Sequence, residues 1–210
     1  MRKRDKILIV ILALGCIVTG SIVSFSKGKT EEKIEKNAKE INYNYGVNVK
    51  KYITEEPEQE NVISKKNIEF LADSMIQAGD ERSREKIIEA LAEREQRKQA
   101  NYLKAIEEGF VVTDEEIEKA IEETKEEIKG TSAEMEIEAF CEGAGITIDE
   151  YWNRQKDVYR KNYLIQKYMR KCQEDFSESS KEEEGFSGDF AEEFERISEE
   201  NIEEFGVVVE

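Results

Sequence analysis

The amino-acid sequence predicts a mainly α-helical protein with an apolar N-terminal segment, on the strength of three observations. The 210 residues include one proline and are rich in Glu and Lys, a composition that favours helices. Apolar residues recur at helical spacing in about five stretches between residues 61 and 176. Three of these stretches open with a Thr-x-x-Glu capping box, at Thr113, Thr131 and Thr147.

The composition allows one modest domain with appendages and disfavours nucleic acid as a partner. Hydrophobic residues make up 38% of the chain and charged residues 39%, which predicts a thin core and a well-solvated surface. The formal net charge is −17, and fifteen acidic residues lie between Glu174 and the C-terminus. A field of this sign repels the phosphates of nucleic acids.

The residue types present argue against an enzyme and against a metal or cofactor site. The chain has no histidine, which excludes a Ser-His-Asp triad, a Cys-His pair and histidine-ligated zinc. Glutamate pairs such as Glu115-Glu116 lie in Glu/Lys-rich segments and are interpreted as solvated helix faces. The helical pattern separates Cys141 from Cys172 by about 30 Å, too far for a disulfide, so we predict that both are buried apolar residues.

The charge and hydropathy pattern of residues 1–25 predicts a membrane segment. A basic stretch, residues 1–6, precedes nineteen uncharged residues at 7–25, which is long enough to cross the hydrocarbon core. The preceding basic residues place the N-terminus in the cytoplasm, so we expect a single-pass anchor in the cell membrane and an extracytoplasmic main domain. Two alternatives are a cleaved signal, which would make the protein secreted, and lipidation at Cys16, although the residues before it make a poor lipobox.

Residues 26–60 form a charged stem in which one stretch, residues 41–49, alternates strictly between apolar and polar positions. Alternation with a period of two predicts a half-buried strand, and such a strand needs a partner for its backbone groups. The one comparable run is Val207–Val209 at the far end, so we predict that the two terminal parts pair. Alternatively, the edge receives a strand from another protein.

The predicted helical domain spans residues 61–176. Its first helix covers residues 67–78 and its second covers residues 81–108, whose middle, residues 93–99, has no apolar side chain and either faces water or lines a polar groove. Two shorter helices follow, and a long helix extends from Ile148 to about Asp175. Residues 177–189 predict a flexible acidic linker, and residues 190–210 predict a last helix and strand that close the domain.

Three motifs in this order resemble the N-terminal chaperone domain of SurA- and PrsA-type foldases. They are ISKKNIEF at residues 63–70, AIEEGFVVTDEEIEKAI at residues 105–121 and GITIDEYWNRQ at residues 145–155. The resemblance covers some 115 residues and implies a helical fold related to the trigger-factor chaperone domain. Family members often continue into a parvulin isomerase domain, whereas here a short acidic linker stands in that place.

The resemblance therefore implies a membrane-anchored, extracytoplasmic chaperone that holds unfolded or newly translocated polypeptides and has no isomerase activity. Such a protein needs apolar surface for its clients, and flexible or aromatic side chains suit that role, although the same residues can equally form the core. The alternative is a non-catalytic scaffold that docks one partner through its strand edge or acidic tail. The candidate peptide-binding residues are Phe70, Met75, Tyr102, Phe110, Phe140, Trp152, Tyr159 and Tyr163.

Overall fold

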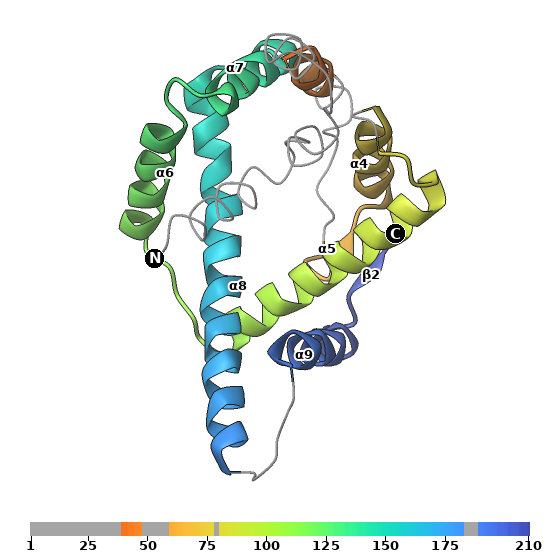
Figure 1. Cartoon of the computed structure of the whole chain (residues 1–210), viewed down its shortest axis with the longest axis vertical. Coiled ribbons are helices and arrows are strands. Elements are labelled where there is room, and N and C mark those ends of the chain that lie inside the picture. The colour runs from red at the N-terminus through yellow and green to blue at the C-terminus, as the bar shows by residue number, and fades with distance from the viewer. Residues whose placement is uncertain (1–38, 48–58, 78–79, 183–188) are drawn as a thin grey trace.

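A computed structural model describes residues 39–47, 59–77, 80–182 and 189–210 of the chain (Figure 1). The expected anchor at residues 7–25 and Cys16 lie outside these ranges. Within the described ranges, no helix is both long enough and apolar enough to cross a membrane.

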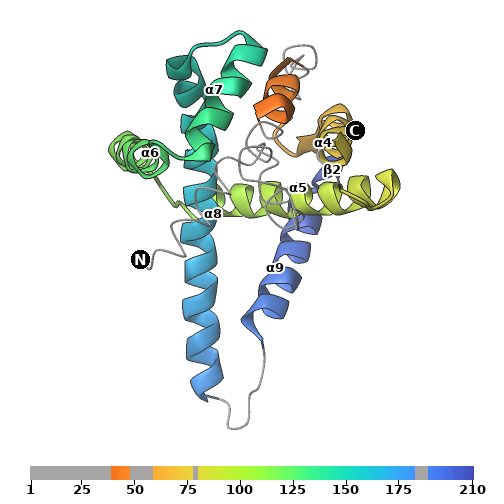
Figure 2. The ribbon, with the colours of Figure 1, turned by 45° about the horizontal axis from the view of Figure 1, so that its top comes forward.

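The described part is mainly helical, as predicted, and the long helix α8 is its axis. At 35 residues, α8 is about 52 Å long. Figures 1 and 2 show α6 and α7 around one end of α8, while α5 crosses its middle and α9 packs against α5, running steeply across it in Figure 2. The elements in chain order are β1 (Val62–Ile63), α4 (Lys65–Gln77), α5 (Arg84–Glu107), α6 (Asp114–Ile128), α7 (Ser132–Ala144), α8 (Ile148–Glu182), α9 (Phe190–Phe205) and β2 (Val208–Val209).

Two of the three predicted capping boxes are confirmed. The Glu116 backbone N–H donates to the Thr113 hydroxyl, and the Thr113 backbone N–H donates to the Glu116 carboxylate at 2.8 Å. Thr147 and Glu150 make the same reciprocal pair at the start of α8. These bonds satisfy backbone donors that an isolated helix end leaves open, so α6 and α8 begin where the sequence predicts.

The third predicted capping box, at Thr131, is wrong. The Thr131 hydroxyl instead donates to the Ile128 carbonyl at 2.6 Å, at the end of the preceding helix. The Glu134 carboxylate accepts from the Gly130 backbone N–H at 2.7 Å, one residue before the predicted partner. The tight turn between α6 and α7 therefore uses both side chains to join the two helices.

The predicted strand at residues 41–49 is also wrong, because residues 39–47 form a helix and the remaining two residues lie outside the described ranges. On this helix the spacing of Asn42, Tyr45 and Gly46 places one buried face against α7, while Tyr43 and Asn44 are exposed. Asn42 and Gly46 are non-apolar positions of the alternating pattern, yet they are buried, whereas the apolar position Tyr43 is exposed. Close packing against α7 therefore decides that these residues form a helix and not a strand.

The C-terminal strand does pair, but with residues 62–63 in place of the predicted residues 41–49. β1 and β2 are parallel, with Val62 opposite Val208 and Ile63 opposite Val209. The Val208 backbone N–H donates to the Asn61 carbonyl at 3.0 Å. Pairing so far apart in the chain depends on where α5 and α9 place the two strands.

The predicted linker at residues 177–189 is helical up to Glu182, where α8 ends. Ser177 and Ser179 fit this helix because their hydroxyls donate to the carbonyls of Gln173 and Asp175, four residues back. The expected last helix is confirmed as α9, which follows its N-cap Asp189.

Three apolar clusters form the core. The first joins α6, α7 and α8, the second joins α4 and α5, and the third joins α5, α8 and α9. Cys141 and Cys172 are buried in the first and third clusters, as predicted, and both are free thiols. Burial raises the pKa of the Cys141 thiol to about 11, which makes it a poor nucleophile.

The polar middle of α5 does not face water on all sides, because the C-terminal segment covers part of it. The Gln96 side chain donates to the Val207 carbonyl at 3.0 Å, and Arg97 pairs with Glu195 at 2.7 Å. Gln99 donates to the Glu60 carbonyl at 2.6 Å, just before β1. Residues 93–99 therefore hold the strand pair and α9 in place.

Candidate functional site

The candidate site is a surface groove between α6 and α8. Three cavities of about 320, 440 and 250 Å³ follow one another along these helices. Lys125, Asp149 and Trp152 line both the first and the second cavity, while Glu118 and Lys156 are among the residues that line both the second and the third. The three cavities therefore form one continuous groove, here named the α6–α8 groove.

The floor of the α6–α8 groove is apolar at the Trp152 end, in the first cavity, whereas polar atoms make up most of the lining of the other two cavities. Trp152, the single tryptophan of the chain, is only 6% exposed and lines the first two cavities. Ile121, Ile128 and Ile137 are buried around it, and Ile148 lies at the edge with 39% of its surface exposed. An apolar group bound here would pack against the floor on one side and would stay exposed to water on the other.

Buried contacts fix the two walls relative to each other. The Tyr159 hydroxyl, on α8, donates to the Thr124 hydroxyl, on α6, at 2.8 Å. The Thr124 hydroxyl in turn donates to the Ala120 carbonyl at 2.9 Å. Burial raises the pKa of Tyr159 to about 12, so the phenol stays protonated and keeps donating. The groove is consequently preformed.

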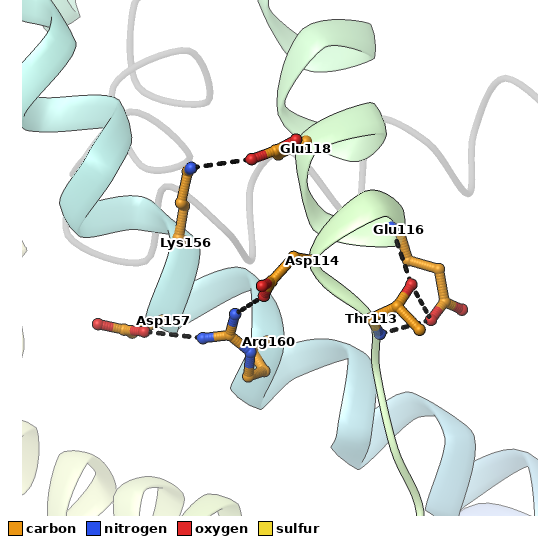
Figure 3. A network of polar contacts seen from close by, with 7 residues as sticks. All are labelled: Thr113, Asp114, Glu116, Glu118, Lys156, Asp157 and Arg160. Carbon is orange, nitrogen blue, oxygen red and sulfur yellow. Dashed lines mark hydrogen bonds and ion pairs between the residues drawn. The ribbon is translucent and has the colours of Figure 1, made fainter.

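Ion pairs neutralise the end of the groove near the start of α6 (Figure 3). Arg160 binds Asp114 at 2.5 Å and Asp157 at 3.0 Å, and Lys156 binds Glu118 at 3.2 Å. All five side chains are at least partly exposed, so each pair stabilises the fold by only about 0.2–1 kcal/mol. Their effect is to leave little unpaired charge at this end.

The opposite end, around Trp152, carries carboxylates without such partners. Lys125 pairs with Glu122 at 2.7 Å, and its ammonium also lies 5.7 Å from the centre of the Trp152 ring. Among the described residues, no hydrogen bond or salt bridge reaches the side chain of Glu138 or Asp149, and both are exposed. The Trp152 end therefore combines an apolar floor with uncompensated negative charge.

The structure separates the eight sequence-predicted site residues into different clusters. Trp152 and Tyr159 are buried, at 6% and 2% exposure, and the other six are half-buried. Of the eight, only Trp152 lines the groove. Phe140, Trp152, Tyr159 and Tyr163 belong to the α6–α7–α8 cluster, Tyr102 and Phe110 to the α5–α8–α9 cluster and Met75 to the α4–α5 cluster, while Phe70 stacks on Tyr45.

Sequence reasoning missed the residues that border the groove. Lys125, Ile148 and Asp149 lie in helix starts or charged helix faces that resemble many others in this chain. Ile148 is the first residue of α8, directly after the Thr147 cap, and no local pattern indicates that it is exposed beside Trp152. The antiparallel placement of α6 and α8 brings these residues together.

Two ionisable groups, the buried Glu136 and the half-buried Lys161, lie outside the groove. Burial raises the pKa of Glu136, on α7, to about 7, and its Oε2 atom has no hydrogen-bond partner within the described ranges. Burial, assisted by the nearby Lys98, lowers the pKa of Lys161, on α8, to about 8. The Lys161 ammonium donates to Gln99 and lies 5.2 Å from the centre of the Tyr102 ring.

The described residues bring together neither a metal-ligand cluster nor an acid–base pair. The described residues contain no group of three or more Cys, Asp or Glu side chains placed to hold a metal ion. Glu136 and Lys161 belong to separate helix interfaces, so they do not form an acid–base pair. Comparisons with protein-family models, with curated proteins and with solved structures found no match to this chain.

Proposed function

We propose that this protein holds unfolded or newly translocated polypeptide segments in the α6–α8 groove, as a chaperone without isomerase activity. The observation that carries the proposal is a continuous, preformed groove with an apolar floor at its Trp152 end and polar lining beyond it. α6 has 15 residues and is about 22 Å long, which matches an extended peptide of about seven residues. Shallow apolar contacts at the Trp152 end, with polar contacts along the rest of the groove, suit weak binding of many sequences.

The sequence motifs support the same proposal. The resemblance to the SurA- and PrsA-type chaperone domain covers the residues that form β1 through most of α8, and the groove lies within this region. The proposed location is extracytoplasmic and at the cell membrane, through the apolar residues 7–25. Secretion after cleavage of this segment remains the alternative.

Two observations weigh against the scaffold alternative. Residues 41–47 are helical and cannot offer the proposed strand edge. The acidic C-terminal part is packed on α5, where Arg97 binds Glu195 and Asn101 binds Ser198. Residues 41–47 therefore offer no strand edge, whereas the acids of α9, such as Glu192, Glu199 and Glu203, are exposed on a helix that is fixed on α5.

A light-scattering experiment tests holding activity. The full-length chain in lipid nanodiscs is mixed with a chemically unfolded client during dilution, and empty nanodiscs serve as the blank. We expect near-stoichiometric suppression of aggregation for two unrelated clients. Absence of suppression with both clients would overturn the proposal, and prolyl-isomerase activity above the uncatalysed rate would contradict its non-enzymatic part.

A matched pair of variants connects this activity to the groove. Ile148→Ser removes an apolar side chain from the groove edge, whereas Ile76→Ser removes an equally exposed one from α4; each isoleucine is 39% exposed. We expect Ile148→Ser to weaken suppression several-fold and Ile76→Ser to leave it unchanged. Equal effects would mean that clients bind elsewhere.

A further inference from the structure

We infer that the α6–α8 groove selects client segments in which an apolar residue is flanked by lysine or arginine. The apolar side chain would lie on Trp152 and Ile148, and the flanking cations would face Asp149 and Glu138. This inference rests on the proposed function and adds the chemical class of segment that the site prefers.

The charges around the first cavity carry the argument. Four acidic and two basic side chains line this cavity together with Ile137, Ile148 and Trp152. The two basic residues are already neutralised, since Lys125 pairs with Glu122 and Lys129 pairs with Glu126. The acidic lining residues are Glu126, Glu134, Glu138 and Asp149.

Glu138 and Asp149 are the two acids available to a client. Glu126 is bound to Lys129, and Glu134 accepts a backbone hydrogen bond from Gly130. Asp149 lies in the first turn of α8, where the helix dipole stabilises a negative charge. A client cation beside the apolar floor would therefore find two unpaired carboxylates.

The selection is confined to one end of the groove. At the other end, Arg160 and Lys156 already bind the nearby Asp114, Asp157 and Glu118. A client charge of either sign must there compete with an existing pair, which gives little net gain. The basic part of a bound segment should therefore lie at the Trp152 end.

The single tryptophan provides a direct measurement of occupancy. The full-length chain in zwitterionic detergent micelles is titrated with a seven-residue peptide of leucine, lysine and serine in which lysines flank the leucine. Its counterpart carries glutamate in place of lysine, and neither peptide contains an aromatic residue. Because Trp152 is the only tryptophan, a change in fluorescence reports binding in the groove.

Two double variants, each of which replaces two carboxylates by neutral amides, test the role of the carboxylates. Asp149→Asn with Glu138→Gln removes the two groove charges, while Glu174→Gln with Glu178→Gln removes two exposed charges from α8, about 38 Å or more along the helix from Asp149. We expect the first pair to weaken binding of the lysine peptide about three- to tenfold, as befits exposed ion pairs. The second pair should leave binding unchanged.

The outcomes separate this inference from the proposed function. Equal affinity for the lysine and glutamate peptides would overturn the selectivity and leave holding intact. Equal weakening by both double variants would show a general charge effect and would also overturn it. No binding of either peptide, together with no suppression of aggregation, would overturn the proposed function itself.

Discussion

Helices pack together in opposite ways in two regions of this molecule, at the α7 end and where α5, α8 and α9 meet. At the α7 end, residues 39–47 and α7 touch through backbone atoms at glycine positions. Where α5, α8 and α9 meet, buried polar side chains form a hydrogen-bond network. The first interface depends on the absence of side-chain atoms, and the second depends on each polar atom having a partner.

The glycine contact is very close. A Cβ atom on Gly143 would lie 2.0 Å from the Tyr43 carbonyl oxygen, and one on Gly46 would lie 2.2 Å from the Phe140 oxygen. Neither distance is compatible with van der Waals radii, so only glycine fits. Tyr45 fills the remaining space by stacking between Phe70 and Phe140.

The polar network joins three helices. The Asn101 side chain donates to Ser198 at 2.9 Å and accepts from Asn201 at 2.9 Å. Asn201 also donates to the Tyr168 hydroxyl at 3.1 Å, and Ser198 donates to the Phe194 carbonyl. A network in which these buried polar atoms are paired fixes how α9 lies on α5 and α8.

The largest expected effect breaks the glycine contact. Gly143→Ala should destabilise the protein by about 3 kcal/mol, because overpacking outweighs the gain of about 1 kcal/mol that alanine brings to a helix. Chemical denaturation measures the change. Glu142→Ala, at the exposed neighbouring position, is the control and should have little effect. Equal stability of both variants would show that the contact does not form.

The buried carboxyl of Glu136 makes the same region sensitive to pH. Its pKa rises from about 4.3 in the unfolded chain to about 7 in the fold, so its protonated form favours the folded state. Stability should fall by about 2 to 3 kcal/mol as the pH rises through this window. Glu136→Gln should remove that part of the slope in denaturation at pH 5 and 8, whereas the exposed Glu142→Gln should keep it.

The polar region should respond to a truncated partner. Asn201→Ala leaves Asn101 and Tyr168 each without one bond, which should cost about 2 kcal/mol of stability. Asn101→Ala should cost a similar amount, and the double variant should cost clearly less than the two together, because both remove the same network. Additive effects in denaturation experiments would argue that the two residues act independently.

Lys161 should give the α5–α8 interface a pH dependence of opposite sign. Its pKa falls from about 10.4 in the unfolded chain to about 8 in the fold, so the fold favours the neutral amine. Below pH 8, burying the charged amine of Lys161 lowers the stability of the fold. This loss becomes smaller as the pH rises towards about 10.4, because the amine then becomes neutral in both states. Lys161→Met should therefore stabilise the protein by about 1 to 2 kcal/mol at pH 7 and by less at pH 10. The exposed Lys119→Met should show no such difference.

The smallest expected effect compares two helix starts. Thr113→Ala removes a complete capping box and should cost about 1 kcal/mol. Thr131 caps no backbone N–H with its side chain, so Thr131→Ala should cost less, through loss of its bond to Ile128 alone. Thermal unfolding of the two variants measures the difference. A larger effect at Thr131 would contradict the observed turn.

Part of the fold follows from local chemistry. The starts of α6 and α8 are predicted because each capping box lies within four residues of sequence. The end of α7 is predicted in the same way, because Gly145 adopts the left-handed conformation that glycine allows at low cost. Of the candidate site, only Trp152 is predicted, since a large aromatic residue is noticeable in any polar helix.

The sequence alone thus determined the helical class, the capped starts of α6 and α8, the last helix and the burial of Cys141 and Cys172. Tertiary structure decided that residues 39–47 are helical, that β2 pairs with β1 and that α6 and α8 enclose a groove. The physical reason is the range of the interactions. Capping bonds join near neighbours, whereas the bond from Gln96 to Val207 joins residues 111 positions apart, and its partner exists only once the chain has folded.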